Sequence, residues 1–299
     1  MSKGPRVGVI ILPQFTWPEA RARWKSLEDR GFAHSWTYDH LSWRDLKDEP
    51  WFGTLPTLMA AATATTTLRL GTWVMSPNYR HPVTTAKDLM TLDDVSGGRL
   101  IAAIGAGGTG WDAAVLGQET LTPRQRVARL DEFVTLTDLL LRQADTTWRG
   151  DWFQAVEAKM IPAGSRRRIE LVVAGNGPRT IGLAATHADG WATTGPESEN
   201  VTTDEWWSRV AGLARTFEDA ATQAGRDPDT IRRYLNLDSA PVLSVSSLAA
   251  FTDAAGRAAD LGFTDAVIHW PRPAGVYAGE GEVLDRIAGT LSAGEWTGR

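Results

Sequence analysis

Eight short apolar runs alternate along this chain with segments of helical spacing, and this alternation decides which folds the chain can adopt. Most of the runs are rich in β-branched residues and lack polar alternation, which is typical of strands buried on both faces. Strand–helix alternation predicts a parallel sheet, and eight repeats predict a closed (β/α)8 barrel of the α/β class. The expected strands are residues 7–12, 35–38, 68–75, 100–104, 169–174, 190–194, 234–237 and 265–270.

The segments between these runs carry the start and stop signals of helices. Residues 19–30 have helical spacing and end at Gly31, as helices closed by glycine do. Residues 143–168 interrupt the alternation, and Arg149-Gly150-Asp151 has hairpin character, so we expect an insertion there. The length suits one barrel and no polar linker divides it, so we expect residues 1–299 to form a single domain. The other expected helices are 54–63, 83–95, 123–142, 178–187, 203–224, 248–261 and 282–291.

The composition excludes several kinds of function. The chain has no cysteine, which excludes disulfides, thiolate metal sites and cysteine nucleophiles. Its 31 basic and 36 acidic residues give a net charge of −5, so nucleic acid is not an expected partner. The five histidines show no metal-ligand spacing, and we expect no metal site. The N-terminus lacks signal-peptide features and no apolar stretch is long enough to cross a membrane, so we expect a cytoplasmic protein.

Gly105, Gly107 and Gly110 form the spacing G-x-G-x-x-G directly after the fourth expected strand. In a dinucleotide-binding domain this fingerprint normally follows the first strand, and an acidic residue ends the next strand about 20 residues later. The acidic residue at that distance, Asp131, lies within an expected helix instead. In a barrel these glycines lie at the C-terminal rim, where active sites are built and where a missing side chain lets a flat ring approach. A flexible rim loop without a ligand is the alternative.

The second expected strand ends in Asp39 and His40, which places both residues at the same rim. Histidine titrates near neutral pH and acts as a general acid or base, while an adjacent carboxylate can accept a hydrogen bond from a bound ring. The alternative interpretation is a capping aspartate beside an ordinary exposed histidine.

Two further strand ends have the character of ligand-binding turns. In Ala174-Gly175-Asn176-Gly177-Pro178, glycines precede a helix that begins with proline, and the free N–H groups of such a turn attract a phosphate. Arg179 follows and adds positive charge. A tight turn without a ligand is the alternative. The third strand ends with a kink into Pro77, where a bulge would push backbone into the barrel mouth.

Taken together, these stretches resemble the luciferase-like (bacterial luciferase) superfamily of flavin and deazaflavin enzymes, which fold as TIM barrels. The resemblance rests on YDH after the second strand, LGTWVMSPNYRHP from the third and LDDVSGGRLIAAIGAG through the fourth. WRGDWF in the insertion and AGNGPRTIGLAATHADGWAT after it complete the set. These strings are more specific to the superfamily than to one of its reactions.

The resemblance implies site residues most like those of the branch that uses coenzyme F420. In that branch an Asp-His pair contacts the ring and supplies the acid or base, which matches Asp39 and His40, and Trp43 matches a tryptophan that faces the substrate. The glutamate that sugar-phosphate dehydrogenases carry after the fourth strand is replaced here by Gly108 or Trp111. The remaining implied cofactor contacts are Trp73 and Val74 (often joined by a non-proline cis peptide), Ser76, Asn78, Gly107, Gly108, Gly175, Asn176, Gly177 and Thr194.

We therefore expect an F420-dependent oxidoreductase that transfers a hydride between the deazaflavin and a small organic substrate, with His40 as general acid/base. The tryptophan-rich rim favours an apolar or aromatic substrate. A flavin monooxygenase that uses reduced FMN and oxygen is the first alternative, and a non-catalytic flavin-binding barrel is the second. The resemblance also implies a homodimer.

Overall fold

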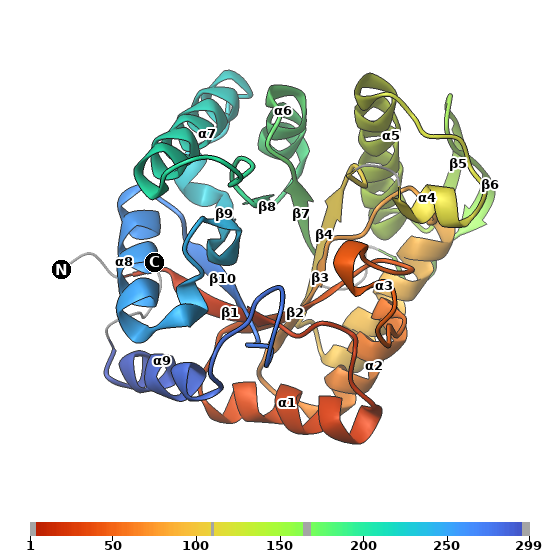
Figure 1. The fold of residues 1–299 in the computed structure, drawn as a ribbon. Coiled ribbons are helices and arrows are strands. Elements are labelled where there is room, and N and C mark those ends of the chain that lie inside the picture. Colours follow the sequence, from red (N-terminus) through yellow and green to blue (C-terminus); the bar gives the residue numbers. More distant parts are fainter. Residues whose placement is uncertain (1–3, 109–110, 164–168, 295–299) are drawn as a thin grey trace.

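Eight parallel strands close into one barrel in the computed structural model, which describes residues 4–108, 111–163 and 169–294 (Figure 1). Around the barrel the strands follow in the order β1, β2, β3, β4, β7, β8, β9 and β10, and β10 pairs with β1. The predicted barrel is confirmed, and every expected strand is present within two residues of its predicted bounds. The barrel strands are β1 (Arg6–Ile10), β2 (His34–Tyr38), β3 (Arg69–Trp73), β4 (Leu100–Gly105), β7 (Glu170–Ala174), β8 (Gly190–Thr193), β9 (Arg232–Asn236) and β10 (Asp265–His269).

A helix follows each barrel strand, and these helices form the outer ring (Figure 1). They are α1 (Trp17–Asp29), α2 (Thr54–Ala64), α3 (Pro82–Ser96), α5 (Pro123–Arg142), α6 (Pro178–His187), α7 (Thr203–Gln223), α8 (Leu248–Asp260) and α9 (Glu282–Ser292). The sequence analysis misses one short helix, α4 (Trp111–Val115), which follows the glycine-rich loop after β4. Among the described residues, four turns of 3-10 helix also lie in the loops: η1 (Arg44–Leu46), η2 (Pro228–Thr230), η3 (Leu237–Ser239) and η4 (Ser244–Ser246).

The insertion contains the expected hairpin. Strands β5 (Asp145–Arg149) and β6 (Gln154–Lys159) pair antiparallel, and the hairpin packs beside α5 outside the barrel (Figure 1). Glu132 of α5 fastens the turn, because its carboxylate accepts hydrogen bonds from Trp148 Nε1 and from the backbone N–H groups of Trp152 and Phe153. Residues 164–168 of the predicted insertion lie outside the described residues.

Two apolar layers form the core. The inner layer fills the barrel and includes Trp36, Trp73 and Tyr234, while the outer layer lies between strands and helices and includes Trp24 and Trp191. Burying aromatic side chains of this size removes a large apolar area from water and stabilises both layers. Several of the 14 tryptophans are therefore core residues and not part of a cavity wall.

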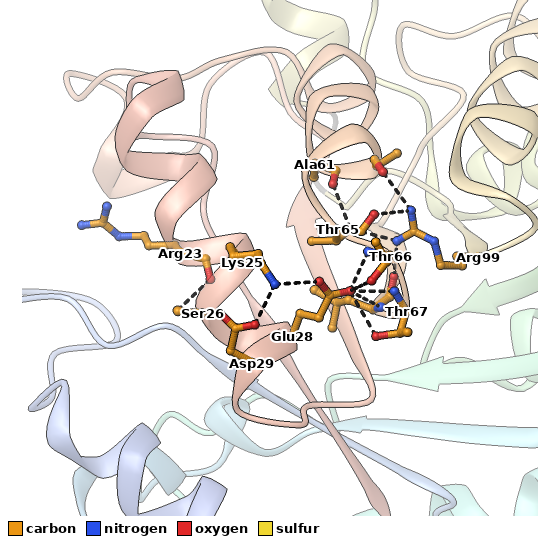
Figure 2. A network of polar contacts seen from close by, with 12 residues as sticks. Arg23, Lys25, Ser26, Glu28, Asp29, Ala61, Thr65, Thr66, Thr67 and Arg99 are labelled. Atoms are coloured by element: carbon orange, nitrogen blue, oxygen red, sulfur yellow. Dashed lines mark hydrogen bonds and ion pairs between the residues drawn. The ribbon is translucent and has the colours of Figure 1, made fainter.

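Stabilising contacts lie at the N-terminal end of the barrel, and the predicted site residues lie at the C-terminal end. At the N-terminal end, Glu28 of α1 accepts hydrogen bonds from the backbone N–H groups of Thr66, Thr67 and Leu68, which ties the helix to the loop before β3 (Figure 2). At the opposite end the C-terminal ends of all eight parallel strands meet at one rim, as in other barrels of this type. The loops after β2, β3, β4, β7 and β8 therefore bring the predicted site residues to the same side of the molecule.

Candidate active site

His40 lies on the rim beside a carboxylate that the sequence analysis does not identify. Its Nδ1 atom is 2.8 Å from Oδ2 of Asp112, a residue of α4 whose side chain is 2% exposed. The other carboxylate oxygen of Asp112 accepts a 2.7 Å hydrogen bond from the backbone N–H of Leu41. Trp51 Nε1 donates to the carbonyl oxygen of His40 at 2.8 Å and holds the loop from the other side. The carboxylate selects the His40 tautomer with its proton on Nδ1, and Nε2 has no partner among the described residues.

Asp39 lies at the same strand end, but its carboxylate is fully buried and paired. Nε and Nη2 of Arg80 donate to the two carboxylate oxygens at 2.6 Å each, in a bidentate geometry that joins the loops after β2 and β3. Burial alone lowers the pKa of Arg80, but the bond with Asp39 outweighs it and the pKa is raised. The pKa of Tyr79 is also raised, by burial and then by the charge of Asp39. Asp39 is therefore a partner of Arg80 and not a free carboxylate.

The third strand ends in the expected bulge. The peptide bond between Trp73 and Val74 is cis, although no proline is involved. Ser76 Oγ accepts a hydrogen bond from the backbone N–H of Asn78 at 3.2 Å, and Asn78 Nδ2 donates to the carbonyl oxygen of Gly107 at 2.8 Å. Asn78 thus connects the bulge to the glycine-rich loop after β4, while Ser76 stabilises the turn that holds Asn78.

A buried arginine of α5 completes this contact. Arg129 donates from Nη2 to Oδ1 of Asn78, while its Nε atom is buried without a hydrogen-bond partner. Burial, and then the charge of Arg126, lower the pKa of Arg129. No carboxylate pairs with Arg129 within the described part of the chain, so an uncompensated positive charge lies beside the bulge.

The rim glycines after β4 differ in what surrounds them. Gly107 has a φ of +83°, and a Cβ there would lie 2.2 Å from Asn78 Nδ2, so the protein itself requires a glycine at this position. Gly108 is exposed, and a Cβ there would meet nothing within 4 Å. Gly110, the last glycine of the motif, lies outside the described residues. Open space therefore borders the loop at Gly108.

The loop after β7 leaves backbone groups free at the start of α6. Asn176 uses its side chain within the protein: Oδ1 accepts from Thr193 Oγ1 at 2.6 Å, and Nδ2 donates to the carbonyl oxygen of Gly195 at 2.5 Å and to Thr194 Oγ1 at 3.2 Å. Gly177 is the N-cap of α6 and has no side chain, so no capping side chain bonds to the N–H groups of the first turn. A Cβ at Gly177 would meet nothing within 4 Å. This helix start can receive an anion.

Aromatic rings line the side of the rim next to His40. The ring of Tyr38 contacts those of Trp43 and His40 at centroid distances of 5.3 and 6.0 Å, and Trp43 stacks on Tyr277 at 6.1 Å. Trp43, for which the resemblance implies a place facing the substrate, is partly exposed. Of the other rim tryptophans, Trp111 is 41% exposed and donates to Ser42 Oγ at 2.9 Å. The wall beside His40 is therefore apolar with a few polar atoms.

Sequence patterns alone do not single out Asp112, Arg80 or Arg129. Asp112 lies two residues after Gly110, and only the short helix α4 turns its carboxylate toward His40. Arg80 lies directly before His81 and Pro82, where α3 begins. The string RHP supports the family resemblance, but it does not indicate that Arg80 pairs with Asp39. Arg129 belongs to the buried face of the amphipathic helix α5. An arginine among apolar residues on a buried face is unusual, and this is the one sequence feature that could have drawn attention to it.

Other features of the described residues lie apart from the rim. A cavity of about 640 Å³ lies between α3, α5 and residues 161–163, and none of the predicted site residues lines it. No three His, Asp or Glu side chains gather as a metal site in the part of the chain that the structure describes. None of the described helices combines the length and the apolar character needed to cross a bilayer.

Comparisons with known proteins give a family, two relatives and a similar fold. A family model described as luciferase-like monooxygenase matches residues 4–240. The F420-dependent hydroxymycolic acid dehydrogenase of Mycobacterium tuberculosis is 28% identical over 96% of this chain and 76% of its own length. The F420-dependent glucose-6-phosphate dehydrogenase of Amycolatopsis mediterranei is 28% identical over 71% of this chain, but over only 62% of its own length. Among solved structures, a monooxygenase of Streptomyces bottropensis has a TM-score of 0.73 at 19% identity, covering 96% of this chain and 98% of its own.

Proposed function

Because the chain belongs to the luciferase-like monooxygenase family, whose members are oxidoreductases, we propose that it is an F420-dependent enzyme that transfers a hydride to or from a small organic substrate. The observation that carries this proposal is the pair of His40 and Asp112 at the barrel rim, with Nε2 of the histidine unpartnered among the described residues. A histidine oriented by a buried carboxylate is the arrangement that a general acid/base requires.

The residues at the rim fit a flat cofactor with an anionic tail. The bulge at Val74 offers a partly exposed apolar surface to a ring, and the open space beside Gly108 admits its edge. The uncapped start of α6, with Gly177 open and Thr194 exposed, would hold the phosphate. Arg129, with a buried Nε that lacks a partner, adds positive charge on the same side of the barrel. Coenzyme F420 supplies, when bound, a ring carbon that accepts or donates a hydride.

His40, oriented by Asp112, would transfer the proton that accompanies the hydride. Asp112 holds the proton of His40 on Nδ1, so Nε2 carries a lone pair and accepts a proton from the substrate during oxidation. In the reducing direction the protonated imidazole of His40 returns that proton to the substrate. The buried carboxylate of Asp112 stabilises the imidazole while it is charged. The aromatic wall of Tyr38, Trp43 and Tyr277 limits the access of water on one side and favours a substrate with an apolar body.

A flavin monooxygenase is the second candidate, because an uncapped helix start receives the phosphate of FMN as well as that of F420. A monooxygenase has to protect an oxygen adduct, whereas a hydride-transfer enzyme needs a positioned acid or base. The His40–Asp112 pair therefore favours hydride transfer. The names of the two curated relatives favour F420 as well. A cytoplasmic location and a homodimer stay predictions.

The proposal is tested by titrating the purified protein with oxidised F420 and, in parallel, with FMN, while tryptophan fluorescence is followed. We expect micromolar quenching by F420 and weaker or no quenching by FMN. A preference for FMN would move the assignment to the monooxygenase. Tight flavin binding without turnover on any reduced cofactor would favour a non-catalytic barrel. Binding of neither cofactor would contradict the assignment of the loop at residues 175–177.

The variant His40→Ala separates binding from chemistry. We expect it to keep the cofactor affinity of the wild type, because two backbone contacts of the loop remain: Trp51 Nε1 bonds to the carbonyl oxygen of residue 40, and Asp112 accepts from the N–H of Leu41. Turnover of a substrate with a reacting C=C or C=N bond, whose proton His40 would exchange, should fall about 100-fold or more, in the range typical of general acid–base catalysis. Unchanged turnover would remove His40 from the mechanism.

A further inference from the structure

A second histidine–carboxylate pair lies inside the barrel mouth and continues into two tyrosines. Nδ1 of His269 is 3.1 Å from Asp238 Oδ2, and its Nε2 is 2.9 Å from the hydroxyl of Tyr38. The hydroxyl of Tyr38 is in turn 2.9 Å from that of Tyr277. Three strand ends contribute to this chain, because Asp238 follows β9, His269 ends β10 and Tyr38 ends β2. The proposed function uses none of these four polar groups.

Hydrogen bonding fixes the direction of every proton in the chain. Asp238 is buried, and its carboxylate accepts from the N–H and hydroxyl of Ser244 and from the backbone N–H of His269. Because a carboxylate only accepts, the proton of His269 lies on Nδ1, so Nε2 accepts from Tyr38. The oxygen of Tyr38 then accepts from Tyr277, and the oxygen of Tyr277 is left with lone pairs to accept a further proton.

Burial keeps His269 and the two tyrosines of this chain uncharged at neutral pH. The pKa of His269 is lowered by burial, against the smaller opposing effect of Asp238. Burial also raises the pKa of Tyr38 and of Tyr277. The chain therefore rests as a neutral imidazole with two neutral phenols, beside one carboxylate.

The open end of the chain lies next to the proposed cofactor site. Tyr38 is the register partner of Trp73, which forms one side of the cis peptide at the bulge. Tyr277 is partly buried in the same inner cluster as Val74, and its ring is stacked between His269 at 3.5 Å and Trp43 at 6.1 Å. Tyr277 also has a φ of +60°, a backbone conformation that is costly for an aromatic residue and clusters at functional sites.

We propose that Asp238, His269, Tyr38 and Tyr277 form a buried proton relay, and that Tyr277 is the catalytic residue that receives the hydroxyl proton of an alcohol substrate or returns it to the corresponding ketone. This inference rests on the proposed hydride transfer and names the substrate class for it, a carbon that bears a hydroxyl or carbonyl oxygen. His40 remains the acid/base for substrates whose reacting C=C or C=N bond has no such oxygen.

The proton and the hydride balance in this scheme. During oxidation the alcohol O–H bond breaks and its proton moves to Tyr277, whose own proton moves to Tyr38. The proton of Tyr38 moves to Nε2 of His269, which becomes an imidazolium beside ionised Asp238. The C–H bond breaks as a hydride that reduces the oxidised deazaflavin, so the alcohol becomes a ketone. Reduction of the ketone reverses each transfer.

The relay is tested with three single variants: Tyr277→Phe, Tyr38→Phe and, as the matched control, Tyr234→Phe. Tyr234 is a buried tyrosine of the same inner cluster, but its hydroxyl bonds to Glu170 at the other end of the barrel. Each protein is given oxidised F420 with 2-propanol or cyclohexanol, and reduced F420 with acetone or cyclohexanone. Cofactor affinity is measured separately by fluorescence.

We expect Tyr277→Phe to lower kcat about 100-fold or more and to raise the KM for the alcohol, since Tyr277 touches the substrate oxygen. Tyr38→Phe should lower kcat as strongly with an almost unchanged KM, because Tyr277 remains in place while the chain is cut. Tyr234→Phe should keep the wild-type kcat. If the tyrosines only supported the fold, all three variants would be less stable. KM and kcat would then not respond differently in Tyr277→Phe and Tyr38→Phe.

A second measurement needs no substrate. Long-range proton–nitrogen NMR of the wild type should show neutral His269 with its proton on Nδ1. A charged ring or a proton on Nε2 would overturn the relay, as would wild-type kcat in both Tyr277→Phe and Tyr38→Phe. Wild-type protein that binds F420 but turns over none of the four probes would overturn the relay and leave the cofactor assignment intact. Failure to bind F420 would instead remove the proposed function, and the relay with it.

Discussion

Nδ1 of His40 and Oδ2 of Asp112 lie 2.8 Å apart, although 72 positions separate the two residues in the sequence. Asp112 accepts a second hydrogen bond from the N–H of Leu41, so one buried carboxylate fixes both the ring and the backbone of the loop after β2. His40 is thus oriented by α4, so the histidine that we propose as general acid/base depends on the helix that follows the glycine-rich loop.

Asp112→Asn should impair turnover while leaving cofactor affinity unchanged. The amide of asparagine can donate to Nδ1, which moves the proton of His40 to Nε2 and blocks its use as a base. We expect a loss of about 100-fold or more in kcat on a substrate with a reacting C=C or C=N bond, and an NMR spectrum in which the His40 tautomer has switched. The control is Asp204→Asn, which alters an exposed ion pair of α7 with Arg257 and should have the wild-type kcat. Wild-type turnover in Asp112→Asn would show that Asp112 only supports the fold.

Gly177→Ala should weaken cofactor binding without harming the fold. The φ of −86° and ψ of 150° at Gly177 are open to any residue, and a Cβ there meets nothing within 4 Å. The added methyl group would occupy the space in front of the α6 N-terminus, where we propose that the phosphate lies. We expect at least a tenfold increase in the Kd for F420, with a melting temperature within a few degrees of the wild type.

The matched control for this glycine is Gly182→Ala in the same helix. A Cβ at Gly182 also meets nothing within 4 Å, but the position lies inside α6, away from its first turn. Alanine there should raise stability by up to about 1 kcal/mol through helix propensity and leave Kd unchanged. Equal Kd values in both variants would place the phosphate elsewhere.

Arg80→Ala should destabilise the protein strongly, because it leaves the fully buried carboxylate of Asp39 without its bidentate partner. Breaking a buried pair in this way costs about 3–5 kcal/mol. The measurement is urea unfolding at pH 7, with Arg30→Ala as the control, since Arg30 pairs with Asp285 on the surface and should contribute less than about 1 kcal/mol. The double variant Asp39→Asn with Arg80→Ala should recover part of the loss. A small effect of Arg80→Ala alone would mean that water reaches Asp39.

Sequence patterns predict the barrel and the rim because both depend on short-range features. Apolar runs of four to eight residues mark the strands, and strand ends alone place His40, Gly108 and Gly177 on one side of the molecule. The resemblance to the family also predicts a non-proline cis peptide between Trp73 and Val74 at the bulge, and this peptide is cis. These inferences require no knowledge of which side chains meet.

The partners of these residues could not be predicted, because they come from distant parts of the chain. Asp112 reaches His40 only through the turn of α4, and Arg80 reaches Asp39 across two loops. Tyr38 and His269 are 231 positions apart and meet because β1 is the single strand between β2 and β10. Spacing along the chain carries no signal for such contacts, and it does not indicate the hydrogen bonds of His269.

Acid should remove a specific part of the stability, through Glu28 at the N-terminal end of the barrel (Figure 2). Burial alone would raise the pKa of this carboxyl, but the N–H groups of Thr67, Thr66 and Leu68 outweigh burial and hold the pKa at about 2, below the ordinary 4.5. Because the folded-state pKa is the lower one, the contribution to stability is complete above about pH 4.5. It is lost as the pH falls through about 2.

Glu28→Gln should therefore lower the free energy of unfolding by about 3 kcal/mol at pH 7, and the difference from the wild type should shrink to less than half by about pH 3. Urea unfolding at a series of pH values measures this difference. Asp29→Asn is the control, since Asp29 shares the partner Lys25 but is 61% exposed and should change stability by less than about 1 kcal/mol at any pH. A difference between wild type and Glu28→Gln that is the same at pH 7 and pH 3 would mean that packing, and not the charge of Glu28, joins α1 to the loop before β3.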